Sequence, residues 1–379
     1  MKRLLTIGHS YVVAANRELA HQLALQGKGA WDVTAVAPAH FRGDLRPIAA
    51  ELIANEACAL ETLPVRLDRV PHLMWFGGRL REILARGWDL VHCWEEPYTF
   101  AASRIAAHVP ARTALVVASF QNISKAYPWP ISMFERTTTT RANGWIAFGE
   151  TVHEALAPRD GYRDKPSRVI PPGVDVHRFR PDPSARHAIR ARLGWPDEAI
   201  VVGYLGRFVE EKGIGLLMNV LRGVLQNTTC RALLVGGGDF EPTLRRFAGD
   251  SRERAHVQTG VPHDDVPAWL NAMDILCAPS VSTPRWREQF GRMLIEAMGC
   301  GVAVVASDSG EMPFVVGDAG VVVGEGDDAG WGQAIVRLVA DEPARRTYAQ
   351  RGIARVHARF SWPTIARQHL EFFDEVAPR

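Results

Sequence analysis

The stretch Ala199-Ile-Val-Val-Gly-Tyr-Leu-Gly206 is typical of a buried strand, and it leads directly into Arg207-Phe-Val-Glu-Glu-Lys-Gly213. A run that is apolar on both faces indicates a strand of a parallel sheet that helices cover on both sides. Similar short runs alternate with longer amphipathic stretches along the whole chain. We expect strands at Arg3–Gly8, Asp32–Ala37, Ala59–Val65, Leu90–Trp94, Thr113–Phe120 and Trp145–Phe148, then at Ile200–Leu205, Ala232–Val235, Val257–Thr259, Ile275–Ala278, Val302–Ala306 and Val321–Val323. Six strand–helix units in each half predict an α/β protein of two doubly wound, Rossmann-like domains.

The expected domain boundary lies in the segment Pro171–Pro181. Three prolines and one glycine in this segment are incompatible with a helix or a central strand. We therefore assign residues 1–172 to an N-terminal domain and residues 173–361 to a C-terminal domain. The tail begins with Ser361-Trp362-Pro363, which is typical of a helix start, and its apolar residues fit packing against the protein. We expect this helix, residues 362–379, to cross back to the first domain.

Composition excludes several classes of protein. With 379 residues, of which 47% are hydrophobic, the chain is long enough for two cores. A net charge of +2, from 44 basic and 42 acidic residues, argues against a nucleic-acid binder. The apolar run near Met1 is too short for a signal peptide, and no apolar stretch reaches the roughly 18 residues that a membrane span needs. The five scattered cysteines fit reduced thiols, so we expect a cytoplasmic protein.

Two cations follow the strand quoted above. Arg207 comes at its exit and Lys212 lies five residues later. Ligands of open α/β sheets bind outside the carboxyl ends of strands, so these side chains are placed to hold a diphosphate. The alternative is a solvated loop in which Lys212 pairs with Glu210 or Glu211. We favour the binding interpretation because of the second motif.

The second motif is Glu288-Gln-Phe-Gly-Arg-Met-Leu-Ile-Glu296, at the predicted start of a helix. Free N–H groups at a helix start bind phosphate, and Gly291 allows close approach. Glu288 can reach a sugar hydroxyl, and Glu296 can accept both hydroxyls of a ribose. In the alternative interpretation, Glu288 favours the helix dipole and Glu296 is a surface charge. The apolar neighbours of Glu296 place it on a partly buried face, and the two motifs together predict a nucleotide-sugar site.

Missing motifs narrow the chemistry further. The run Gly236-Gly-Gly-Asp239 follows a strand, but the chain has neither GxGxxG nor GxxxxGK[ST] at this place. This argues against an NAD oxidoreductase and a P-loop NTPase. The chain also contains no Asp-x-Asp pair to hold a divalent ion on the diphosphate. We therefore expect no metal and no cofactor, with the protein's own cations neutralising the diphosphate.

The chain resembles the retaining glycosyltransferases of family 4, which have the two-domain GT-B fold. The resemblance rests on Pro172–Asp175, Gly206–Gly213, Glu288–Glu296 and the tail helix at Trp362–Val376. It implies that Arg207 and Lys212 bind the donor diphosphate and that Glu288 contacts the transferred hexose. It also implies that Glu296 holds the ribose, while the backbone around Phe290 and Gly291 contacts sugar and phosphate. Gly206 and Arg292 complete the set of donor-site candidates.

The acceptor side is expected in the first domain. Candidate residues follow its strands: His9, Glu95, Gln121, Asn122 and Lys125. Family members often carry a histidine where this chain has Gln121, which can bind a hydroxyl but cannot shuttle a proton. The segment Met74–Arg81 has two interpretations, an interfacial membrane contact or a helix start packed on the sheet, and we favour the second.

These observations lead to one hypothesis and its rivals. We expect a metal-independent, retaining hexosyltransferase that moves a sugar from a UDP- or GDP-linked donor to an acceptor hydroxyl, after closure of a cleft between the domains. The acceptor would be a sugar, a lipid-linked molecule or a small molecule, in glycan, polysaccharide, glycolipid or glycoconjugate biosynthesis, with a peripheral contact at the inner membrane face as an option. The alternatives are a non-catalytic sugar-nucleotide-binding subunit and a GT-B epimerase or phosphorylase.

Overall fold

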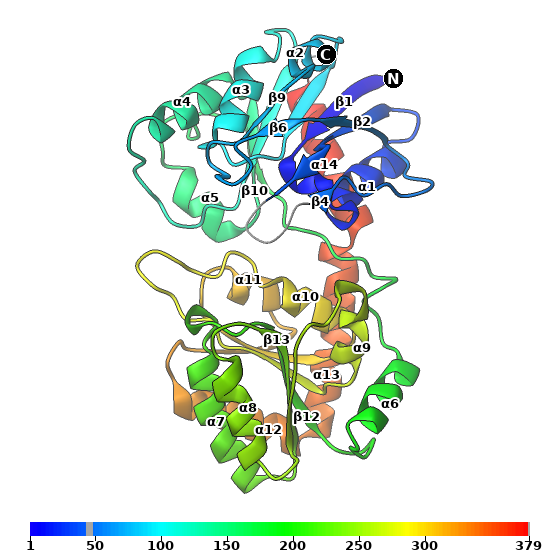
Figure 1. Ribbon diagram of the computed structural model, residues 1–379, viewed down its shortest axis with the longest axis vertical. Helices are drawn as coiled ribbons and strands as arrows, with labels where there is room; N and C mark the ends of the chain where they lie inside the picture. The colour runs from blue at the N-terminus through cyan, green and yellow to red at the C-terminus, as the bar shows by residue number, and fades with distance from the viewer. Residues whose placement is uncertain (43–47, 378–379) are drawn as a thin grey trace. The chain divides into compact units, whose positions relative to one another are not determined.

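The computed structural model describes residues 1–42 and 48–377 of the chain. These residues form two compact units, Met1–Gly173 with Trp362–Arg379, and Val174–Ser361 (Figure 1). Each unit is built around one parallel sheet with helices on both faces. The predicted α/β class with two Rossmann-like units is therefore confirmed. The last two residues of the tail lie outside the described residues.

The first unit has a seven-stranded parallel sheet in the order β11-β10-β9-β8-β1-β2-β5. Its strands are β1 (Lys2–Ile7), β2 (Trp31–Pro38), β5 (Ala59–Leu63), β8 (Leu90–Cys93), β9 (Ala114–Ser119), β10 (Gly144–Ala147) and β11 (Ser167–Val169). Two small antiparallel hairpins lie beside it, β3 (His40–Phe41) with β4 (Ile48–Ala49) and β6 (Val65–Arg66) with β7 (Trp75–Phe76). The sequence predicted six strands, and the seventh, β11, was missed.

Helices cover both faces of this sheet. They are α1 (Glu18–Gln26), α2 (Leu80–Leu84), α3 (Phe100–His108), α4 (Ile131–Arg141), α5 (Glu150–Leu156) and α14 (Trp362–Val376), with 3-10 turns η1 (His9–Val12) and η2 (Ala14–Arg17). Because side chains alternate along a strand, Leu4 of β1 enters the core beneath α1 and α14, whereas Leu5 enters the core beneath α2, α3 and α5.

The tail helix α14 packs against the first unit, as the sequence predicted. Its residues Ile365, Leu370, Phe372 and Phe373 are buried in the same core as Leu19 and Leu23 of α1. Lys2 of β1 also forms an ion pair of 2.9 Å with Asp374 of α14. The last helix of the chain is thus part of the first unit's core.

The second unit has a six-stranded parallel sheet in the order β14-β13-β12-β15-β16-β17. Its strands are β12 (Val201–Arg207), β13 (Arg231–Gly237), β14 (Ala255–Gln258), β15 (Ile275–Ala278), β16 (Ala303–Ser307) and β17 (Gly320–Val323). All six were predicted, with bounds that differ by at most a few residues.

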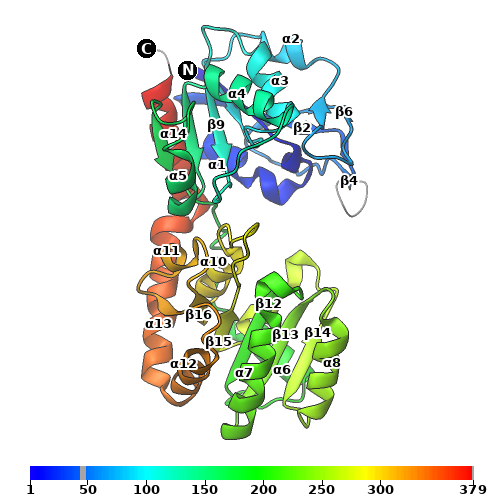
Figure 2. The ribbon, with the colours of Figure 1, turned by 90° about the vertical axis from the view of Figure 1, so that its left-hand side faces the viewer.

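The helices of the second unit are α6 (Pro183–Arg192), α7 (Ile214–Asn227), α8 (Glu241–Asp250), α9 (Val266–Asn271), α10 (Arg292–Gly299), α11 (Met312–Val316), α12 (Asp328–Ala340) and α13 (Glu342–Arg355), with turns η3 (Glu210–Lys212), η4 (His263–Asp265) and η5 (Val356–Phe360). The helices α7, α8 and α12 share one core on one face of the sheet (Figure 2). The helices α9, α10 and α11 share the core on the other face.

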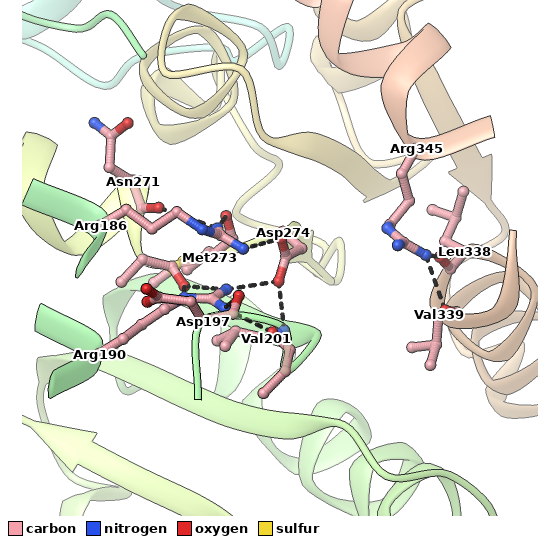
Figure 3. Close-up of polar contacts among 12 residues, drawn as sticks. Arg186, Arg190, Asp197, Val201, Asn271, Met273, Asp274, Leu338, Val339 and Arg345 are labelled. Atoms are coloured by element: carbon pink, nitrogen blue, oxygen red, sulfur yellow. Dashed lines mark hydrogen bonds and ion pairs between the residues drawn. The ribbon is translucent and has the colours of Figure 1, made fainter. Parts of the chain in front are cut away.

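A polar cluster centred on Asp274 fixes the amino ends of β12 and β15. Its carboxylate accepts hydrogen bonds of 2.7 Å each from Arg186 and Arg190 of α6 and from the backbone N–H of Val201 (Figure 3). The fully buried Arg190 also donates to the carbonyl oxygen of Ala272. A partly buried carboxylate and a buried guanidinium satisfy each other here, so this cluster anchors α6 to the sheet.

Candidate functional site

The order of strands reverses once in the second sheet. The chain lays down β12, β13 and β14 on one side and β15, β16 and β17 on the other, so the reversal lies between β12 and β15. In open α/β sheets the ligand crevice lies outside the carboxyl ends of the two strands at such a reversal. Arg207 ends β12, Lys212 follows in η3, and Ser280 and Glu288 follow β15. The structure therefore brings both sequence motifs to one edge.

Lys212 and Glu288 form the central contact of this edge. The Nζ of Lys212 lies 2.5 Å from Oε2 of Glu288, and both side chains are largely buried. The hydroxyl of Ser280 donates to the same oxygen at 3.0 Å. The ring of Trp286 lies 4.9 Å from the Lys212 ammonium. The alternative in which Lys212 pairs with Glu210 or Glu211 is therefore wrong.

Two glycines allow the loops to pack this closely. Gly213 has a φ of +69°, and a Cβ there would lie 1.8 Å from the carbonyl oxygen of Pro279. Gly310 has a φ of +53°, and its Cβ would lie 2.0 Å from the carbonyl oxygen of Glu288. A larger residue at either position would push the loop after β15 away, so both glycines position Glu288.

A hydroxyl and carboxylate network connects the remaining loops. The Glu325 carboxylate, after β17, accepts hydrogen bonds from both the backbone N–H and the hydroxyl of Ser282, at 2.6 and 2.5 Å. The Ser282 and Ser309 hydroxyls are 3.0 Å apart. The loops after β15, β16 and β17 are thus tied together next to Glu288.

Helix α10 carries the second carboxylate of the motif. It begins at Arg292 after Gly291, whose φ is +79°, and Phe290 is buried against Phe360. Glu296 is buried, and burial raises the pKa of its carboxyl to about 7, although the charges of Arg292 and Arg178 act in the opposite direction. A carboxylate that burial destabilises gains from hydrogen-bond donors, which the hydroxyls of a ribose would supply.

Arg207 differs from Lys212 in its surroundings. Its side chain is 64% exposed, and its guanidinium lies 3.3 Å from the Glu211 carboxylate. It lies at the last position of β12, where Gly206 has a φ of +153° and the Tyr204 hydroxyl donates to the carbonyl oxygen of Arg207 at 2.7 Å. Arg207 is therefore available to an anion without breaking a buried pair.

The first sheet has the same kind of reversal, between β1 and β8. His9 follows β1 and Glu95 follows β8. The Glu95 carboxylate accepts from the backbone N–H of His9 at 2.5 Å and contacts its Nδ1 at 2.7 Å. The structure thus brings these two acceptor candidates together. The side chain of Glu95 is only 1% exposed, whereas that of His9 is 35% exposed.

The other acceptor candidates follow β9. Gln121 is buried, and its amide is engaged by its own loop: its Nε2 donates to the Ile123 carbonyl and its Oε1 accepts from the Tyr127 hydroxyl. Asn122 is also buried, whereas Lys125 is exposed. Gln121 therefore stabilises the conformation of the loop after β9, which the sequence did not reveal.

Sequence reasoning missed several residues of these edges. Glu96 accepts from the Ser119 hydroxyl and the Phe120 N–H at 2.7 Å each, and burial raises the pKa of its carboxyl to about 7. Ser280 and Trp286 were also missed. Ser280 comes just after the predicted strand β15 and Trp286 lies two residues before Glu288, and these positions could have indicated that both belong to the site.

A cavity of about 510 Å³ lies at the opposite, amino-terminal edge of the second sheet. Arg186 and Asp274, which line it, bond to each other, and Arg345 caps helix α12 through the carbonyl oxygens of Leu338 and Val339 (Figure 3). These charges serve the fold, so we do not assign this cavity to the functional site.

Comparison with known proteins adds to this geometry. A family model described as Glycosyltransferase Family 4 matches residues 12–178, and one described as Glycosyl transferases group 1 matches residues 199–341. A D-inositol 3-phosphate glycosyltransferase of Xylanimonas cellulosilytica is 31% identical over 319 residues, which are 80% of this chain and 71% of the relative. The chain belongs to glycosyltransferase family 4.

Other members of this glycosyltransferase family match over shorter segments. A GDP-mannose-dependent alpha-(1-6)-phosphatidylinositol monomannoside mannosyltransferase of Mycolicibacterium smegmatis is 37% identical over 195 residues. That match spans about half of each chain (50% of both).

Solved structures agree on the GT-B fold. A sucrose-phosphate synthase of Thermosynechococcus elongatus matches with a TM-score of 0.74 at 21% identity, over 99% of both chains. Anabaena HepE in complex with UDP matches with a TM-score of 0.72 at 21% identity, over 99% of this chain and all of the other. None of the helices among the described residues of this glycosyltransferase has the length and apolar character that crossing a membrane requires.

Proposed function

We propose that this glycosyltransferase moves a hexose from a nucleoside-diphosphate sugar to an acceptor hydroxyl, with retention at the anomeric carbon and without a metal ion. The observation that carries this proposal is the Lys212–Glu288 pair at the strand reversal of the second sheet. A buried lysine and glutamate offer the two functions that a sugar diphosphate needs, a cation for the leaving diphosphate and a carboxylate for sugar hydroxyls. The Mycolicibacterium smegmatis relative is GDP-mannose-dependent, which supports this assignment.

On the donor side, Lys212 and the exposed Arg207 bind the diphosphate. When the donor arrives, Lys212 turns from Glu288 towards the phosphates, and Glu288 is released to accept from the hexose hydroxyls. The backbone of Gly206, Phe290 and Gly291 contacts sugar and phosphate, and Arg292 adds positive charge. Glu296 binds the ribose. Because two cations already face the diphosphate, no divalent ion is needed to neutralise the leaving group.

On the acceptor side, we propose that the first unit binds an inositol-containing acceptor, either a soluble inositol phosphate or a phosphatidylinositol glycolipid. The names of two relatives, a D-inositol 3-phosphate glycosyltransferase and a phosphatidylinositol monomannoside mannosyltransferase, support this choice. The donor is then a GDP- or UDP-linked hexose, with GDP-mannose as the first candidate. The protein would act in glycolipid biosynthesis at the cytoplasmic side of a membrane.

A peripheral membrane contact would come from the first unit. Met74 and Phe76 are buried, so the interfacial interpretation of Met74–Arg81 does not hold for those two side chains. Exposed apolar residues instead lie in the loop between β6 and β7 and in the segment that leads into the first turn of α4, and the rings of Tyr98 and Tyr127 beside them are 4.7 Å apart. These residues are Leu67, Val70, Leu73, Trp129 and Met133. The exposed Arg66, Arg69 and Lys125 accompany them, a composition that suits an anionic lipid surface.

One set of assays tests the function. Purified protein is screened for binding of UDP, GDP and ADP, and then for release of the nucleoside diphosphate from the matching sugar with and without D-inositol 3-phosphate or phosphatidylinositol vesicles. Acceptor-dependent release that persists in EDTA, with an α-linked product from an α-linked donor by NMR, is the expected result. Binding without acceptor-dependent release of nucleoside diphosphate would indicate a non-catalytic sugar-nucleotide-binding subunit instead.

The membrane contact has its own test. Trp129→Ser with Leu73→Ser is expected to reduce co-sedimentation with phosphatidylinositol vesicles. Leu25→Ser, which changes an exposed leucine of α1 in the same unit, serves as the matched control. Equal sedimentation of all three proteins would contradict the assigned surface.

A further inference from the structure

The strand reversal of the first sheet holds a contact that the proposed function has not yet used. His9 begins η1 directly after β1 and Gly8, and Glu95 lies two residues after β8. The neighbouring Gly8 comes close to the strand across the reversal, because a Cβ there would lie 3.0 Å from the Cβ of Trp94. This approach places His9 over Glu95 at the position where open α/β sheets bind ligands.

The Glu95 carboxylate fixes the orientation of the His9 ring. Its two oxygens contact the backbone N–H and the Nδ1 of the same residue, at 2.5 and 2.7 Å. A carboxylate bound at Nδ1 keeps the proton on that nitrogen, which sets the tautomer of the neutral ring. The ring of Phe41 packs against it at 5.2 Å. The other nitrogen, Nε2, has no hydrogen-bond partner among residues 1–42 and 48–377.

Burial distinguishes the roles of the two residues. With 1% of its side chain exposed, Glu95 cannot touch a substrate, whereas His9 is about one-third exposed. We propose that the Nε2 of His9 accepts a hydrogen bond from the hydroxyl of the acceptor that receives the sugar, and that Glu95 is the positioning residue that holds the proton of the neutral ring on Nδ1 and so aims Nε2 as the acceptor atom. The inference rests on the proposed function, because it needs an acceptor on the first unit. It replaces the earlier expectation that Glu95 itself contacts the acceptor.

This arrangement orients a nucleophile. A hydroxyl that donates its proton to Nε2 turns an oxygen lone pair away from the ring, so the oxygen is presented for attack. The protonated ring would donate instead and would turn the hydroxyl the other way. The acceptor step should therefore require the neutral form of His9.

Among the residues that the structure describes, the charged groups that face His9 are Glu95 and Glu96. Burial lowers the pKa of His9, but the charge and hydrogen bond of Glu95 and the charge of Glu96 outweigh it, so the pKa lies above its usual 6.5. Acceptor turnover should rise with pH through the His9 pKa. This rise is the acidic limb of the pH profile. Replacing Glu95 by glutamine removes the nearest negative charge, so the acidic limb should move to lower pH.

The experiment measures two quantities in the full-length wild type, Glu95→Gln and His9→Gln. NMR titration of the His9 ring gives its pKa in the first two proteins, with His9→Gln supplying the assignment. Acceptor kcat/KM against pH is measured with GDP-mannose and D-inositol 3-phosphate, or with the other donor and acceptor probes if these are the active ones. We expect the acidic limb to coincide with the NMR pKa, to move down with it in Glu95→Gln by about one unit, and to vanish in His9→Gln.

A matched control exists in the second unit. His187 contacts Asp197 through Nδ1 at the same 2.7 Å on helix α6, away from either strand reversal. Asp197→Asn should leave the acidic limb in place. All variants should keep the wild-type affinity for GDP or UDP, which shows that the donor site is intact, and the wild-type near-UV circular dichroism, which shows that the first unit is folded.

The outcomes are distinguishable. An acidic limb that stays in place in Glu95→Gln while the NMR pKa of His9 moves would assign the limb to Glu96 or another group and overturn the inference alone. The same holds if His9→Gln keeps the full kcat/KM. If nucleoside diphosphate binds but no probe accepts a sugar, the proposed function fails, and the inference falls with it.

Discussion

Each of the two sheets carries a contact between a basic residue and a glutamate at its strand reversal, but the basic residue differs between the sheets. The second sheet pairs Lys212 with Glu288 at 2.5 Å, and the first pairs His9 with Glu95 at 2.7 Å. In each case the basic residue follows the first strand of the unit and the carboxylate follows the strand across the reversal. Lysine is charged throughout the neutral pH range, which suits a diphosphate, whereas histidine can be neutral, which suits a hydroxyl. One topology therefore offers two binding chemistries.

The largest expected effect comes from deleting α14, which should unfold the first unit and leave only the Lys212–Glu288 pair of the second. A chain that ends at Ser361 lacks α14, and with it the buried Ile365, Phe372 and Phe373. Loss of one such side chain typically costs roughly 2–5 kcal/mol, so the first unit should unfold. The second unit is continuous from Val174 to Ser361 and should still bind nucleoside diphosphate. Calorimetry with GDP and near-UV circular dichroism check this, and a fully active truncated chain would refute it.

The second prediction concerns the Lys212–Glu288 pair. Lys212→Ala should lower nucleoside-diphosphate affinity roughly ten- to a hundredfold, because charge-assisted hydrogen bonds contribute about 1.5–3 kcal/mol. Arg222→Ala, an exposed basic residue of α7, is the control and should have no effect. The measurement is calorimetric titration with GDP and UDP in EDTA. Unchanged affinity, or an absolute need for magnesium, would mean that Lys212 does not hold the diphosphate.

The third prediction concerns the buried imidazoles beneath the first pair. His92 of β8 and His369 of α14 lie with ring centres 5.6 Å apart, and neither Nε2 has a hydrogen-bond partner in the described chain. Burial lowers the pKa of His369 to about 4, although its backbone contact with Ile365 opposes this, and burial also holds the pKa of His92 well below 6.5. The unfolded chain therefore takes up more protons, and stability falls as pH drops below about 6.5.

The variant His369→Leu isolates this effect. Between pH 7 and pH 5, one such histidine should cost about 2 kcal/mol, so the variant should lose that much less free energy of unfolding than the wild type. Urea denaturation at both pH values measures it, with the exposed His187→Leu as control. An identical pH dependence in all three proteins would contradict the role of burial.

The smallest expected effect distinguishes the roles of Glu288 and Glu296 in the second unit. Glu296→Gln should weaken binding of both nucleoside diphosphate and donor by about tenfold, since it removes a charged acceptor for ribose hydroxyls. Glu288→Gln should spare the bare nucleotide and lower turnover. Because the Glu296 pKa is raised to about 7, wild-type nucleotide affinity should rise with pH through that value, and this dependence should vanish in Glu296→Gln. Reversed profiles by calorimetry and steady-state kinetics would exchange the two roles.

The sequence predicted the sheets because buried parallel strands are apolar on both faces, as in β8 and β9. Strand β11, Ser167-Arg168-Val169, escaped notice because it is a half-buried edge strand with a polar composition. Edge strands do not need apolar residues on both faces, so their periodicity is weak.

The sequence predicted candidate residues for the second site, but it did not predict their contacts with one another. Lys212 pairs with Glu288, 76 positions away, rather than with its sequence neighbours. That choice depends on the adjacency of β12 and β15 and on the close approach of Gly213 to Pro279, neither of which is a local property. Likewise, Glu95 was expected at the substrate, but its burial beneath His9 is visible only once β1 and β8 lie side by side.

The placement of α14 also has a consequence for biosynthesis. Translation runs from the amino to the carboxyl end, so residues 1–173 emerge before the second unit, yet the core face that α14 covers stays open until α14 follows. The second unit, whose residues are contiguous, can complete its core before the first. A nascent chain therefore exposes Leu19, Leu23 and Trp31 while the second unit is being made, which makes the first unit the part more prone to aggregation before α14 arrives.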